Sequence, residues 1–174
     1  MVRDILSVDT SRRELFVQTA GRVSNGSEPN TERDPYYRDL VRIQLDTGEL
    51  TTLASGNDDV NTVSALHPDV NAMYAIGFGR TMAAVSSISP SGNYAAVTRS
   101  RADSVPVNLL LDRNGQEILE IEKAELSALY TAISKDWKWP EPVKLLAADG
   151  KTDIYGLVFR PSDFSSTQSY PIIT

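Results

Sequence analysis

The sequence predicts a mainly β protein with two tandem units of four antiparallel strands. Three observations favour this fold class. Short runs with alternating apolar and polar residues recur along the chain, turn sequences separate these runs, and the whole four-strand pattern occurs twice. The chain has 174 residues, 41% of them hydrophobic, so it is long enough to bury a core.

The first four-strand unit begins near the amino terminus. Its strands share a hydrophobic period of two, and we expect them at residues 4–9, 14–20, 40–46 and 50–53. Residues 10–13 and the dipeptide Thr47-Gly48 provide turns between consecutive strands. Residues 21–35 are polar and rich in turn formers, which predicts an exposed loop.

The second unit repeats this arrangement. We expect its strands at residues 85–89, 94–99, 107–112 and 117–121, and Val97 then corresponds to Val17 of the first unit. Tandem four-stranded units are typical of β-propeller blades. A blade buries its faces only against neighbouring blades, so two of them predict part of a larger protein. Between the units, residues 57–84 form an irregular insert that could carry a strand at 73–78.

The remaining residues have a different character. Apolar side chains at helical spacing predict a short amphipathic helix over 122–134, and the Trp-Lys-Trp-Pro run predicts an extended linker over 136–142. Strands at 143–147 and 154–160 flank Asp149-Gly150, a strong hairpin signal. Residues 170–174 read as the start of a further strand.

Composition excludes several classes of site. The chain has no cysteine and one histidine, so it has no thiolate zinc site, iron–sulfur cluster or cysteine nucleophile. A net charge of −6 disfavours nucleic acid as a partner. No run approaches the roughly 20 apolar residues of a membrane helix. We expect no metal and no cofactor, and the sequence leaves open whether the protein is cytoplasmic, periplasmic or secreted.

Three groups of residues are candidate sites. His67 precedes a proline and has no evident serine partner, so a loop histidine is favoured over a catalytic base. Residues 57–61 (NDDVN) lack the glycine and distal glutamate of a calcium loop, which favours a solvated turn. Gly77-Phe78-Gly79 is only a fragment of a dinucleotide-binding motif.

The aromatic residues are expected to pack rather than to bind ligands. Tyr36 and Tyr37 lead into a strand, and Trp137 and Trp139 flank the linker, so we expect at least one indole to be largely buried. Arg38 between two aspartates predicts a surface ion pair.

Several motifs in one order resemble the prolyl oligopeptidase family of serine peptidases, and most closely its bacterial dipeptidyl peptidase IV-like branch. They are residues 34–42 (DPYYRDLVR), 89–94 (SPSGNY), 137–142 (WKWPEP), 147–156 (AADGKTDIYG) and 159–161 (FRP). Members of this family join a β-propeller to an α/β-hydrolase domain. The resemblance implies C-terminal propeller blades over 1–125, a helix and linker over 126–142, and the first hydrolase strands over 143–174.

The resemblance also implies which parts of the catalytic machinery the chain lacks. The oxyanion-hole tyrosine, the nucleophile in G-x-S-x-G, the aspartate and the histidine would follow the Tyr-Pro-hydrophobic strand at 170–174, and this sequence contains no G-x-S-x-G. The glutamates that hold a substrate amino terminus would lie earlier in the propeller. We therefore expect an excised, catalytically inactive segment of a parent peptidase that hydrolyses short peptides, with the propeller restricting access.

The sequence leaves one alternative function open and predicts one further property. The alternative is a propeller that serves as a binding or scaffold module without peptidase activity. Exposed blade edges in the segment predict self-association.

Overall fold

The structure is a computed structural model that describes residues 1–21, 34–62, 86–132 and 137–173. The described part is mainly β, with antiparallel four-stranded sheets, as the sequence predicts. It divides into two compact units. Met1–Arg101 and Pro106–Lys123 form the first, and Ala102–Val105 and Ala124–Thr174 form the second. No helix in these ranges is long and apolar enough to span a membrane.

The first sheet follows the sequence prediction closely. Its strands are β1 (Val2–Asp9), β2 (Glu14–Ala20), β3 (Arg38–Gln44) and β4 (Leu50–Ala54), hydrogen-bonded in that order. All three neighbouring pairs are antiparallel. The strand limits shift by two residues at most, because tertiary pairing rather than local sequence sets where a strand begins.

The second sheet contains β5 (Asp59–Asn61), β6 (Tyr94–Arg101), β7 (Ser104–Asp112) and β8 (Glu117–Lys123) in that order. The prediction for its first strand was wrong. In the expected 85–89 strand, Ile88 makes only an isolated bridge to Ala95, whereas β5 pairs with residues 98–100 of β6. The first strand is thus interrupted by the insert, and β5 is too short to show an alternating pattern.

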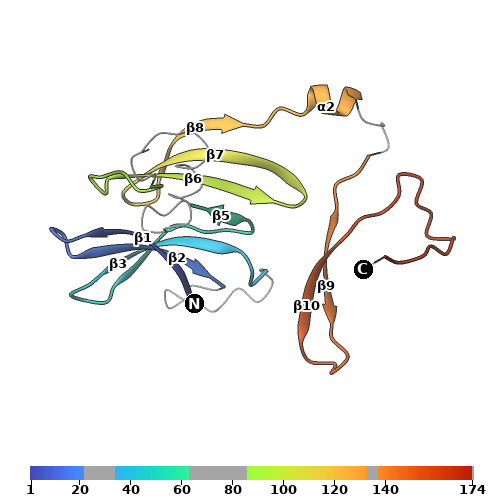
Figure 1. Cartoon of the computed structure of the whole chain (residues 1–174), viewed down its shortest axis with the longest axis horizontal. Helices are drawn as coiled ribbons and strands as arrows, with labels where there is room; N and C mark the ends of the chain where they lie inside the picture. Colours follow the sequence, from blue (N-terminus) through green and yellow to red (C-terminus); the bar gives the residue numbers. More distant parts are fainter. Residues whose placement is uncertain (22–33, 63–85, 133–136, 174) are drawn as a thin grey trace, which may run out of the picture. The chain divides into compact units, whose positions relative to one another are not determined.

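The two sheets of the first unit pack face to face and share one core, and Figure 1 shows them stacked. Phe16 and Leu40 contribute from the first sheet, and Val97 and Leu109 contribute from the second; all four are at most 5% exposed. In β6 and β7 the core residues alternate along the strand, Ala95 with Val97 and Leu109 with Leu111, which explains the period of two there; β8 is exposed throughout and contributes no core residue.

The second unit contains α2 (Ser127–Ala132), β9 (Glu141–Leu146) and β10 (Asp153–Val158). The helix begins at Ser127 and not at residue 122 as predicted, since residues 122–123 belong to β8; residues 133–134 of the prediction lie outside the described residues. The described helix buries no side chain. The predicted hairpin is confirmed: β9 and β10 pair antiparallel around a turn in which Gly150 has φ 65°.

One further expectation for this unit was wrong. Residues 170–173 form no strand, and Ile172 and Ile173 are 89% and 95% exposed, because no described strand lies beside them to pair with. The two tryptophans pack against each other, in line with the packing role expected for them. Trp137 and Trp139 are both partly exposed and pack edge to face at 5.0 Å, and the Trp139 indole donates a hydrogen bond to the Tyr130 hydroxyl.

Candidate functional site

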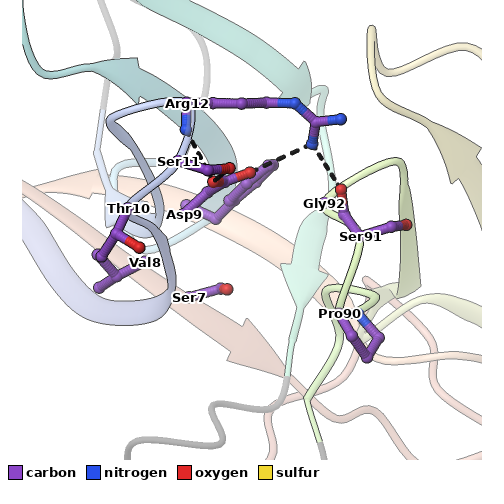
Figure 2. A pocket seen from close by; sticks show the side chains of 10 residues that line it. Ser7, Val8, Asp9, Thr10, Ser11, Arg12, Pro90, Ser91 and Gly92 are labelled. Carbon is purple, nitrogen blue, oxygen red and sulfur yellow. Dashed lines mark hydrogen bonds and ion pairs between the residues drawn. The ribbon is translucent and has the colours of Figure 1, made fainter.

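A groove of about 440 Å³ lies in the first unit, where a turn of each sheet meets the other. One wall is the turn between β1 and β2, and the other is the turn that precedes β6 (Figure 2). The lining is mainly polar and comprises Ser7, Val8, Asp9, Thr10, Ser11, Arg12, Phe16, Pro90, Ser91 and Gly92. These are the turns that correspond in the two repeats, so the groove follows from the repetition itself.

Asp9 is the centre of the first wall. One of its carboxylate oxygens accepts hydrogen bonds from the Ser11 hydroxyl at 2.6 Å and the Arg12 backbone N–H at 2.9 Å. The other accepts from the Arg12 guanidinium at 3.2 Å. These bonds, led by that of Ser11, lower the pKa of Asp9 to about 2. The carboxylate is ionised near neutral pH and too weakly basic to accept a proton there.

Arginine side chains connect the two walls. The Arg12 guanidinium also donates to the Ser91 carbonyl at 2.6 Å, as Figure 2 shows. Arg113, from the β7–β8 turn, donates to the Gly92 carbonyl at 3.0 Å and forms an ion pair with Glu14 of β2. Arg42 of β3 donates to the Arg113 carbonyl at 2.9 Å. The groove is therefore a junction in which charged side chains of one sheet bind backbone groups of the other.

A second polar junction lies at residues 57–61, the segment for which a solvated turn was favoured over a calcium loop. Asp59 accepts hydrogen bonds from the backbone N–H and the guanidinium of Arg38, each at 2.8 Å, and Asp58 pairs with Arg99 at 2.8 Å. The expectation of a solvated turn was wrong, because these acids are bound by arginines and Val60 is buried. The described ranges contain no cluster of three acidic or histidine side chains suited to a metal ion.

The remaining candidates separate into two groups. His67 and Gly77-Phe78-Gly79 lie outside the described residues. The expected packing role fails for Tyr36, whose side chain is 75% exposed and whose backbone N–H donates to the Asp34 carboxylate at 2.8 Å; Tyr37 is partly buried.

Among the described residues that line the groove, no acid–base pair for catalysis is present. Ser7, Ser11 and Ser91 supply hydroxyls, but in the described ranges no histidine lies beside them, and Asp9 is held ionised by its donors. Without a base, a serine hydroxyl is not an effective nucleophile. The arrangement can hold two sheets together and present polar groups to solvent.

Sequence reasoning missed these long-range contacts. Arg12 and Ser91 are 79 residues apart, and Arg113 and Glu14 are 99 residues apart. The available signal was the alignment of residues 9–11 with 89–91, which places two equivalent turns at the same end of neighbouring repeats. Comparison of the chain with protein-family models finds no match, and comparison with curated proteins finds none.

Proposed function

We propose that this chain is a non-catalytic segment of a serine peptidase of the prolyl oligopeptidase family, in the dipeptidyl peptidase IV-like branch. Residues 1–125 supply propeller blades, and residues 143–174 supply the first strands of an α/β-hydrolase domain. The parent enzyme hydrolyses short peptides through a Ser-Asp-His triad outside these 174 residues, and the propeller limits which substrates reach it.

One observation carries the proposal: two successive four-stranded antiparallel sheets pack face to face and share a core. This is how neighbouring blades bury their surfaces. The order of elements adds support, because a Trp-Pro linker and the separate hairpin β9–β10 follow the second sheet, in the order the family resemblance implies.

Labelling with a serine-directed fluorophosphonate tests the proposal. The probe forms a covalent bond only with a serine hydroxyl that a neighbouring base activates. We expect the full-length product of the gene to be labelled and the 174-residue chain to remain unlabelled. Short peptides should compete with the probe, whereas folded proteins should not.

Two outcomes would contradict the proposal. If the full-length product is not labelled, the propeller serves as a binding or scaffold module instead. If the 174-residue chain is itself labelled, then its own residues include an active serine and the non-catalytic assignment is wrong.

A further inference from the structure

The β7–β8 turn of the first unit contains the dipeptide Asn114-Gly115. Asn114 is exposed, and the glycine follows it directly in the chain. In such a pair the main-chain nitrogen of the glycine can attack the side-chain amide carbon of the asparagine, because glycine has no Cβ to hinder the approach. The turn therefore contains both groups of a reaction that requires only water.

Hydrogen bonds hold these two groups in a fixed turn. The Gly115 N–H donates to the Asp112 carbonyl at 3.1 Å. The Asp112 carboxylate accepts the N–H groups of Asn114 and Gln116, each at 2.8 Å. A nitrogen whose N–H donates within the turn is not placed to attack the neighbouring side chain. The reaction thus requires a local opening of the turn.

We propose that Asn114 is a site of spontaneous covalent modification, which opening of the β7–β8 turn converts to isoaspartate. The Gly115 nitrogen loses its proton to solvent and bonds to the side-chain carbon Cγ of Asn114. The bond from Cγ to the amide nitrogen breaks, so ammonia leaves and a cyclic imide remains. Water then opens the ring at either carbonyl and yields isoaspartate or aspartate. In total, water is consumed and ammonia released, without oxidation or reduction.

This inference goes beyond the proposed function, because it concerns the stability of the first unit and requires no peptidase activity. Two other described turns lack one of the reacting groups. Asn93 is followed by Tyr94, whose side chain obstructs the approach of its nitrogen. Asp149 is followed by Gly150, but its carboxylate accepts two backbone N–H groups at 2.8 Å. These bonds favour the ionised form, which resists attack by a nitrogen.

The product does not fit the turn. In isoaspartate the main chain runs through Cβ and Cγ, so the backbone gains a carbon atom. Even a Cβ on Gly115 would overlap the Leu53 carbonyl oxygen of β4, which leaves no space for a longer chain. Arg113, the residue before the site, donates to the Gly92 carbonyl and pairs with Glu14 of the first sheet. Formation of isoaspartate should therefore displace Arg113 and weaken the junction between the two sheets.

Peptide mass spectrometry measures the rate of conversion. A protease that cleaves before aspartate releases residues 112–135 as one peptide. Conversion to aspartate creates a new cleavage site before residue 114, whereas isoaspartate changes the peptide mass without being cleaved. At mildly alkaline pH we expect Asn114 to be converted at least about tenfold faster in urea than in the folded chain. Asn93 should remain unchanged in the folded chain.

The matched variants are Glu14→Gln and Glu49→Gln, which make the same chemical change and leave the sequence beside Asn114 intact. The Glu14 side chain is 10% exposed and pairs with Arg113, whereas Glu49 is exposed in the β3–β4 turn. We expect several-fold faster conversion in folded E14Q, because the turn opens more often, and the wild-type rate in E49Q. A wild-type rate in E14Q, or equal rates in urea and in the folded chain, would overturn the proposal.

Asn114→Asp separates the effect of the longer backbone from that of the new charge. This variant has a carboxylate like the product, but its main chain has the normal length. We expect the chain that contains isoaspartate to unfold at a lower urea concentration than both the wild type and N114D. Equal midpoints for the isoaspartate chain and N114D would refute displacement of the turn. A folded wild-type chain that forms no isoaspartate on prolonged incubation would refute the site itself.

Discussion

At the scale of single residues, buried charges are satisfied across the interface between the sheets. Glu14 has a side chain only 10% exposed, and it contacts Arg113 of the second sheet and, at 3.8 Å, Arg42 of its own sheet. A buried carboxylate that loses its ion-pair partner destabilises the fold, because the free energy of its removal from water is no longer offset. The ion pair between Arg13 and Asp46, with side chains 62% and 54% exposed, is a solvated pair of the same chemistry.

Replacing Arg113 by methionine should destabilise the first unit by about 2 kcal/mol, because Glu14 and the Gly92 carbonyl both lose a donor. Arg13→Met should change stability by no more than about 0.5 kcal/mol. Urea unfolding measures both, as a lower midpoint at an unchanged slope. Equal effects of the two variants would contradict the assigned role of Arg113.

At the scale of elements, the turns position the sheets as much as the strands do. Gly115, in the β7–β8 turn, has φ 84°, and a Cβ there would overlap the Leu53 carbonyl oxygen of β4. Gly48, in the β3–β4 turn, has φ 72° and nothing within 4 Å of a Cβ. The two turns share a backbone conformation but differ in their surroundings.

Replacing each of these glycines by alanine distinguishes the cost of backbone strain from the cost of steric overlap with neighbouring atoms. Gly48→Ala should cost about 1 kcal/mol, the price of a left-handed conformation for a residue with a Cβ. Gly115→Ala should cost roughly 3 kcal/mol or more, since β4 must also move away from the turn. Thermal unfolding of the two variants provides the comparison, and similar melting temperatures would show that the turn does not contact β4.

At the scale of the whole molecule, the two sheets of the first unit should unfold together. Their common core contains Phe16 of β2 and Val97 of β6, each at most 3% exposed. A sheet that loses its partner exposes its own apolar face to water. A substitution that destabilises one sheet is therefore expected to destabilise the other sheet as well.

Val97→Ala should destabilise the first unit by about 2 kcal/mol, through lost burial and the remaining cavity. Hydrogen exchange should accelerate in β2 as well as in β6, although the substitution lies only in β6. Leu145→Ala, at a position 61% exposed in β9, is the control and should leave exchange in β2 unchanged. Faster exchange confined to β6 would show that the sheets open independently.

The sequence predicted elements best where a complete strand pairs with its neighbour in the chain, as β2 does with β1 and β3. For β2 the expected limits, residues 14–20, match the structure, because Phe16 and Gln18 face the second sheet while Leu15 and Val17 face away. The prediction from sequence failed where strand pairing depends on residues that are far apart in the chain. β5 and the bridge at Ile88 together serve as one strand, although 26 residues separate Asn61 from Ile88, and no local pattern can indicate this.

The amino-acid sequence by itself determined the class of fold, the repeat of four strands and the position of most turns, because the period of two and the turn residues are local properties. Only the tertiary structure decided which charges pair. Asp58 and Asp59 resemble a solvated acidic turn until Arg99 and Arg38 are placed beside them, from positions 41 and 21 residues away. The physical reason is that an ion pair depends on distance in space, and folding, not sequence order, sets that distance.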